Sequence, residues 1–198
     1  EEFRGRSAGR EFAVQYVMVL HSLGKAEDAL IELRRQLELG GNEKGAWRDR
    51  LLLLYGLIAS PADGAGRAAL ESLVEGGKGM EWMEMGLHLL VSGAAEDGKS
   101  SAFLDKVLQI PRHPLTEAVI GLRLKLALGA KENDVAEACA RRLMEEFPGS
   151  PRRPEALRAL AAASWRVKPP KYRLVGDFLT RLRELEKDVE KKEELSAW

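Results

Sequence analysis

Glycine, proline and polar turn segments interrupt this 198-residue sequence at regular intervals, and this spacing constrains the fold more than any other feature. The stretches between the interruptions are rich in leucine and alanine, which number 31 and 25, whereas isoleucine, valine and threonine together number 17. Strong helix formers therefore dominate and strand formers are scarce. The interruptions predict ten helices joined by short turns, at residues 8–23, 26–39, 45–59, 65–76, 80–92, 99–109, 114–128, 134–147, 152–166 and 171–192.

Apolar residues inside these stretches recur with the period of an amphipathic helix. One example follows the spacing i, i+4, i+7, i+11, which places the four side chains on one face of a helix: Trp47, Leu51, Leu54 and Ile58. No convincing alternation typical of a strand is present. Short turns between consecutive helices favour antiparallel neighbours, so the ten helices pair into five hairpins.

The hairpins recur with a period of about 35 residues. The first helix of each pair is expected to end near Gly24, Ser60, Gly93, Gly129 and Lys168, at intervals of 36, 33, 36 and 39 residues. Two helices in each unit of this length indicate an α-solenoid. The expected units are residues 8–40, 45–77, 80–111, 114–148 and 152–192 of a single domain spanning 1–198, and the last helix is expected to cap the array.

Two segments resemble the tetratricopeptide (TPR) repeat. In "LHSLGKAEDALIELRRQLEL" (20–39), Gly24 fits the small residue of the turn between the helices and Ala29 fits the small residue where they pack closely. Gly129 and Ala136 fit the same positions in "LALGAKENDVAEACARRLMEEFPGSP" (126–151). The "FPGSP" continuation is similar to repeats of bacterial envelope TPR proteins. The resemblance implies an all-α, right-handed α-solenoid of about five antiparallel helical hairpins.

The charge balance and the apolar runs limit which kinds of partner this chain is expected to bind. Lys and Arg together number 31, as do Asp and Glu, so the formal net charge is zero. A balanced chain lacks the electrostatic footprint of a nucleic-acid-binding protein, and we expect no nucleic-acid partner. No apolar run approaches the ~20 residues that cross a bilayer, so no direct membrane span is expected. The "FPGSP" resemblance slightly favours the bacterial periplasm or envelope over the cytoplasm, with any leader removed.

Residues suited to catalysis or metal binding are few. The single cysteine, Cys139, excludes an intramolecular disulfide and is expected to be a small buried residue. His21, His88 and His113 share no metal-binding spacing. No nucleophile motif is present. We therefore expect no catalytic residue, no metal and no cofactor, and a chain that is not an enzyme.

One segment does match a nucleotide-binding motif. Gly93–Ser100, "GAAEDGKS", fits the phosphate-loop pattern G-x-x-x-x-G-K-[ST]. A phosphate loop joins a buried strand to a helix, yet residues 80–92 read as a helix. Glu96 and Asp97 would also repel phosphate. We interpret the match as two turn glycines around a helix start, and keep a P-loop nucleotide-binding domain as an alternative.

The leading hypothesis is a non-enzymatic scaffold that binds a protein or peptide segment in the concave groove of a TPR superhelix. The resemblance implies that the first helix of each hairpin lines this groove, and the expected residues are Arg48, Tyr55, Met83, Leu87, Leu90, Arg123 and Trp165. Leu87, Leu90 and Trp165 could instead pack against neighbouring hairpins, whereas Arg48, Tyr55 and Arg123 are expected to avoid the core. An oligomerisation module of a larger protein, with a second copy as partner, is a further alternative.

Overall fold

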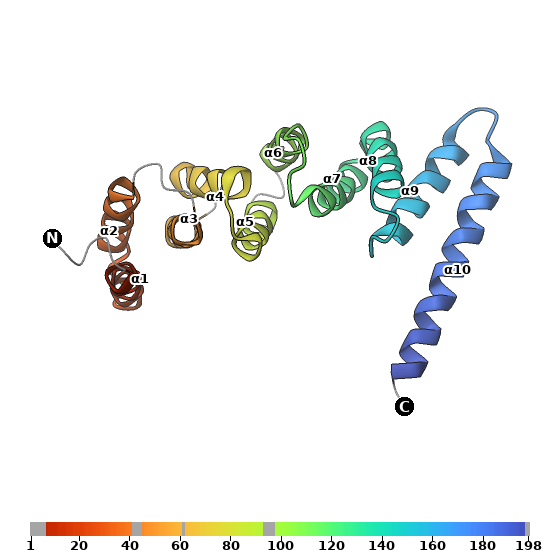
Figure 1. The fold of residues 1–198 in the computed structure, drawn as a ribbon. Helices are drawn as coiled ribbons and strands as arrows, with labels where there is room; N and C mark the ends of the chain where they lie inside the picture. Colours follow the sequence, from red (N-terminus) through yellow and green to blue (C-terminus); the bar gives the residue numbers. More distant parts are fainter. Residues whose placement is uncertain (1–6, 41–44, 61, 93–97, 197–198) are drawn as a thin grey trace. The chain divides into compact units, whose positions relative to one another are not determined.

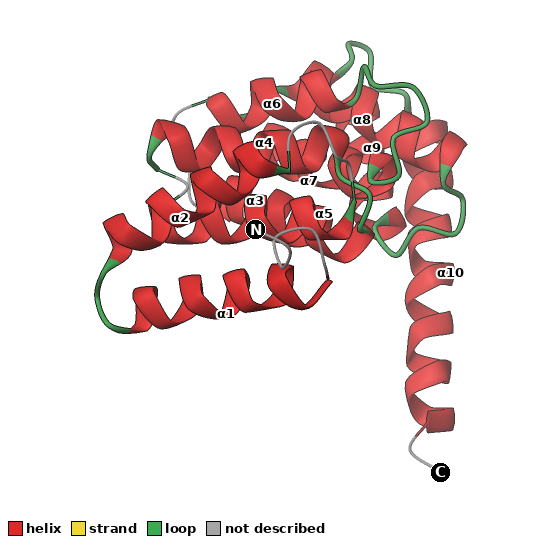
Figure 2. Cartoon of the chain, turned by 60° about the vertical axis from the view of Figure 1, so that its left-hand side comes forward, coloured by secondary structure: helices red, strands yellow, loops and turns green. Residues whose placement is uncertain are grey.

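The structure, a computed structural model, describes residues 7–40, 45–60, 62–92 and 98–196, and side chains within 9–186 of these. The described chain is entirely helical, with no strand (Figure 2). Its helices are α1 (Ser7–Ser22), α2 (Ala26–Leu39), α3 (Ala46–Ala59), α4 (Gly64–Gly76), α5 (Met80–Ser92), α6 (Lys99–Val107), α7 (Thr116–Ala130), α8 (Asn133–Glu146), α9 (Arg153–Arg166) and α10 (Tyr172–Ser196). The ten predicted helices are thus confirmed, with ends that differ by a few residues.

The contacts of the chain divide it into two compact units, residues 1–103 and 104–198, and the boundary falls within α6. In the first unit each helix packs on the next one along the chain, from α1 to α5 (Figure 1). In addition, α3 packs on α5 and α1 touches α3, so the first helices of successive hairpins lie against each other. Adjacent-helix packing is therefore the rule in this unit.

Leucine is the commonest residue in the core of the first unit, which also contains valines, alanines and single methionine, tyrosine and phenylalanine side chains. Its largest fully buried side chains are Leu33, Leu51, Leu70, Leu73, Met83, Leu87 and Leu90. The closest approach between helices is at Gly56 of α3, where an added Cβ would lie 2.3 Å from Cγ of Leu70 in α4. A glycine is required there because a methyl group would overlap the leucine side chain.

The second unit repeats this arrangement: α7 packs on α8, α8 on α9 and α9 on α10. Its core lies between α7, α8 and α9 and includes Ile120, Leu124, Leu143 and Leu160. Cys139 of α8 is buried in this cluster, as the sequence predicted. The small residues predicted at the close helix contacts, Ala29 and Ala136, are also buried.

The turns agree with the sequence prediction at one hairpin and differ at another. Gly24 follows α1 with φ +75° and the Lys25 N–H donates to the Leu20 carbonyl, so the helix ends in a left-handed residue. Gly129, predicted to have the same role, lies inside α7. Lys131 has the left-handed conformation instead, with φ 60°, because α7 continues to Ala130.

Helix α10 covers α9 with one apolar stripe, as expected of a terminal helix. Phe178, Leu182 and Leu185 are the least exposed of its long apolar side chains, together with Val175. Leu174, four residues before Phe178, has the spacing of this stripe but is exposed. Nowhere in the described ranges is there a helix both long and apolar enough to cross a membrane.

Candidate functional site

Helix α1 and the turn that follows it carry an exposed apolar stripe, defined by Phe12, Tyr16 and Val19 of the helix and Leu23 of the turn. Phe12 is 72% and Leu23 66% exposed, and the other two side chains are also exposed. The spacing i, i+4, i+7, i+11 places all four on one side of the helix. Large apolar side chains that share a helix face and lack a covering element mark a binding surface.

The stripe is separate from the face that α1 uses in its own fold. Ala13, Val14, Val17 and Leu20 are buried and hold α1 against its neighbours. Residues of the stripe lie about 100° around the helix from this buried face. Helix α1 is thus apolar on two sides, although the described residues cover only one of them.

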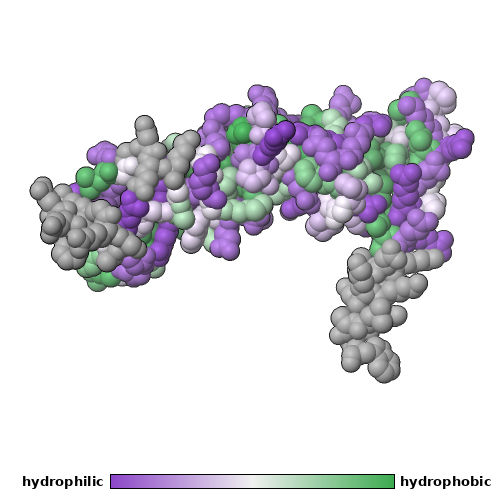
Figure 3. Space-filling model, in the orientation of Figure 1, coloured by the Kyte–Doolittle hydropathy of each residue, from purple (hydrophilic) through white to green (hydrophobic). Residues whose placement is uncertain are grey.

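The rings of Phe12 and Tyr16 are stacked, with centroids 6.4 Å apart and planes within 4° of each other. Beside them a hollow of about 230 Å³ opens between α1 and α2. It is lined by Gly9, Phe12, Ala13, Tyr16, Glu32, Arg35 and Gln36. Figure 3 shows hydrophobic surface in the region of α1, at the lower left of the view. This hollow offers an apolar wall from α1 and a polar wall from α2.

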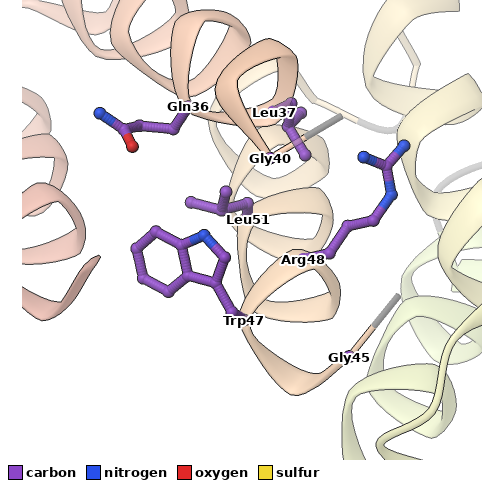
Figure 4. A pocket seen from close by; sticks show the side chains of 7 residues that line it. All are labelled: Gln36, Leu37, Gly40, Gly45, Trp47, Arg48 and Leu51. Atoms are coloured by element: carbon purple, nitrogen blue, oxygen red, sulfur yellow. The ribbon is translucent and has the colours of Figure 1, made fainter. Parts of the chain in front are cut away.

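A second, much smaller hollow of about 20 Å³ lies between the end of α2 and the start of α3. Its lining residues are Gln36, Leu37, Gly40, Gly45, Trp47, Arg48 and Leu51. Figure 4 shows Trp47 on the same side as Gln36, whereas Arg48 extends away from Trp47. Arg48 is half-buried and is the one predicted groove residue that lines a hollow.

Three of the predicted groove residues in the first unit are buried: Tyr55, Met83 and Leu87. The expectation that Tyr55 would avoid the core is wrong, because α3 packs against α2, α4 and α5 and has few free sides. The Tyr55 hydroxyl accepts a 2.8 Å hydrogen bond from Arg34 Nε, so its polar atom is satisfied without solvent. Leu90 is also buried, which confirms the packing alternative for Leu87 and Leu90.

Arg123 is likewise buried, contrary to expectation. Its guanidinium donates to Asp105 at 2.9 Å and to Glu132 at 2.7 Å. Burial acts to lower the pKa of Arg123, but the hydrogen bonds and charges of the two carboxylates outweigh it and the pKa is raised above its ordinary value. Arg123 therefore joins α6 to the α7–α8 turn and offers little surface to a partner.

Trp165 differs from expectation in the opposite direction, since it is 58% exposed at the end of α9. Its ring meets that of Tyr172 edge-to-face, with centroids 5.7 Å apart. The stripe of α9 that packs on its neighbours consists of alanines and leucines instead. Of the seven predicted groove residues, Arg48 and Trp165 thus keep the most accessible surface.

The predicted P-loop alternative falls partly outside the described residues, which omit 93–97. The segment before it, α5, is a helix, so it is not the strand that a phosphate loop follows. Gly98 has φ +68° and precedes α6. The Ser100 hydroxyl is buried and donates to the Leu90 carbonyl at 3.2 Å, so it faces the protein interior.

Residues suited to metal binding are dispersed. Across the described ranges, no three His, Cys, Asp or Glu side chains lie close enough together to hold a metal ion. His21 and His88 are exposed on separate helices. His113 is buried in the turn before α7, where its Nδ1 accepts the Leu115 N–H.

Comparison with family models, with curated proteins and with solved structures finds no match for this chain. The function therefore has to be argued from the surface itself. The stripe on α1 was not among the residues predicted from sequence, although its spacing was visible there. It was missed because α1 reads as apolar on most sides, and the sequence alone does not tell which side the neighbours cover.

Proposed function

We propose that this chain is a non-enzymatic, TPR-like interaction scaffold that binds a helical segment of a partner protein through the exposed stripe of α1. In this proposal the five hairpins stack as one right-handed solenoid, as the period and the resemblance imply. The packing of α3 on α5 supports it, since solenoid repeats place equivalent helices side by side. The exposure of Phe12, Tyr16, Val19 and Leu23 is the observation that carries the proposal.

The chemistry of the stripe indicates what it would bind. Two aromatic and two aliphatic side chains in one line complement the apolar face of an amphipathic helix. Such helices present their anchors at the same i, i+3, i+4, i+7 spacing. Glu32, Arg35 and Gln36 border the adjoining hollow and would meet the polar flank of that helix. Exposed aromatic residues of this kind commonly supply most of the binding energy of an interface.

The same stripe also supports a second candidate function, oligomerisation, in which the partner helix is α1 of another copy. The four side chains of the stripe offer on the order of 400 Å² per copy, if an aromatic side chain contributes about 200 Å². Doubled, this area is slightly below the lower limit for a specific interface, about 1,000 Å², so a stable dimer would need contacts from residues beside the stripe.

Partner capture tests the proposal. The variant Tyr16→Glu with Val19→Glu places two charges on the stripe, and Gln15→Glu with Ser22→Glu places two charges on exposed positions beside it. We expect the first variant to lose the proteins that the wild-type chain retains from an extract of its own cells, and the control to keep them. Recovery of the same proteins with both variants would exclude the stripe as the binding surface.

Sedimentation equilibrium of the wild-type chain and of its two double variants distinguishes partner binding from oligomerisation. A wild-type dimer that Tyr16→Glu with Val19→Glu converts to monomer would establish oligomerisation. A wild-type monomer with stripe-dependent capture would establish a partner of another kind.

A further inference from the structure

The connection between α9 and α10 concentrates positive charge and exposed aromatic rings. Residues 165–173, "WRVKPPKYR", contain four cations and no acidic residue. We refer to them as the basic aromatic loop. In sequence the nearest acidic residues are Glu155 and Asp177. Every one of the cations is exposed: Arg166, Lys168, Lys171 and Arg173.

These four cations are not neutralised by the described part of the protein. None of them forms an ion pair with a described residue, whereas other cations of the same unit do. Arg141 pairs with Glu137, Arg142 with Glu146 and Arg158 with Glu186. The loop therefore presents uncompensated positive charge to its surroundings, although the chain as a whole is neutral.

The aromatic rings of the loop are held in place but not covered. Trp165 is 58% and Tyr172 65% exposed, and their rings meet edge-to-face at 5.7 Å. The Lys171 N–H donates to the Ser164 carbonyl at 3.0 Å, which ties the end of the loop to the end of α9. Val167 adds a further exposed apolar side chain between them. Figure 3 shows hydrophobic and hydrophilic surface side by side in this region, at the upper right.

We propose that the basic aromatic loop binds the surface of an anionic lipid bilayer. Lysine and arginine near such a surface are attracted to its headgroup phosphates. Tryptophan and tyrosine favour the boundary between headgroups and hydrocarbon, because their rings are apolar and their N–H and O–H groups are polar. The loop places both kinds of side chain within nine residues, at the end of α9 and the start of α10.

A bilayer fits these observations better than two other anionic partners. An acidic peptide would meet the four cations alone, whereas a bilayer would also take up the exposed rings of Trp165 and Tyr172. A nucleic-acid strand needs cations along several successive phosphates, whereas the four cations of the loop lie within nine residues. Both partners remain outcomes of the test below.

Sedimentation of the full chain with lipid vesicles tests the proposal. We expect binding to vesicles of phosphatidylcholine and phosphatidylglycerol, weakening as salt is added, and none to phosphatidylcholine alone. Each cation near the surface contributes a factor of about five to the partition coefficient, so Lys168→Gln with Lys171→Gln should lower it about 25-fold. Lys25→Gln with Lys78→Gln removes the same charge from exposed positions of the first unit and should leave it within about twofold.

Tryptophan fluorescence supplies an independent measurement of the loop. Vesicles should shift the emission of the wild-type chain to shorter wavelength, and Trp165→Phe should remove most of that shift while the other three tryptophans remain. An absence of vesicle binding would overturn the proposal, as would an equal loss in the control pair. Binding of polyglutamate or of single-stranded DNA without binding of anionic vesicles would equally overturn it and assign the loop to that partner.

Discussion

The buried carboxylate of Asp49 in α3 accepts a 2.7 Å hydrogen bond from the backbone N–H of Gly79, the residue before α5. The same oxygen, Oδ2, accepts the Lys78 N–H at 2.7 Å. Asp49 is 2% exposed. Backbone N–H groups at a helix start have no partner within the helix, and a negative charge there is favourable. A side chain of one hairpin therefore fixes where the first helix of the next hairpin begins.

Replacing Asp49 by alanine should destabilise the first unit by about 2–3 kcal/mol, because two backbone N–H groups at the start of α5 lose a charged acceptor. Denaturation in urea measures this loss. Asp63→Ala is the matched control, since Asp63 precedes α4 without a side-chain capping bond, and its cost should stay below about 0.5 kcal/mol. Equal costs for the two variants would show that the Asp49 contact contributes nothing specific.

Gly56→Ala should destabilise the chain by about 1–3 kcal/mol, because the new Cβ would overlap Leu70. Helix propensity acts the other way and favours alanine by up to about 1 kcal/mol. Gly176→Ala isolates that opposing effect, since no atom of another residue lies within 4 Å of the added Cβ and the position is helical. We expect the melting temperature to fall for Gly56→Ala and to rise slightly for Gly176→Ala.

Arg123→Leu should cost about 2–3 kcal/mol, because the change breaks two charge-assisted hydrogen bonds and with them the link between α6 and α8. The loss is limited because Asp105 and Glu132 are partly exposed and regain water. Arg141→Leu removes an exposed pair with Glu137 and should cost less than about 0.5 kcal/mol. Urea denaturation that ranks the two variants in the reverse order would contradict this account.

Leu182→Asp should uncover α9 and promote aggregation, because Leu182 is buried where α10 packs on α9. Leu179→Asp, three residues earlier, alters an exposed side chain of the same helix. Light scattering during heating should rise at a lower temperature for Leu182→Asp than for Leu179→Asp. A monodisperse Leu182→Asp protein with wild-type melting would show that α10 is not required to cover α9.

The thiol of Cys139 should react slowly in the native chain. Burial raises its pKa, with a partly compensating effect of the nearby Arg123 charge, so less reactive thiolate is present at neutral pH than for an ordinary cysteine. The rate of reaction with a disulfide reagent should increase as the pH rises through a value above the usual thiol pKa. Urea should abolish the protection, and a fast native reaction at neutral pH would contradict the raised pKa.

The sequence by itself determined the helices and most of their boundaries. Apolar spacing with a period of 3.6 residues and the positions of glycine and proline act through the local backbone, so they can be interpreted without knowledge of neighbours. The resemblance to the TPR repeat predicted the close packing of Ala29 and Ala136, and the small and apolar neighbours of Cys139 predicted its burial; all three are buried. One local prediction was wrong. Gly129 was expected to end its helix, but α7 continues to Ala130 and Lys131 adopts the left-handed conformation of the turn.

Only the tertiary structure decided which face of each helix meets a neighbour. An apolar stripe in the sequence predicts that a helix is covered on one side only. Helix α3 packs against helices on several sides, so Tyr55 is buried and its hydroxyl is hydrogen-bonded by Arg34. Arg123 enters the interior because two carboxylates from other segments compensate its charge. The stripe on α1 and the ring of Trp165 stay exposed because no described element packs over them. Burial depends on contacts between residues far apart in the chain, and a local sequence pattern does not contain them.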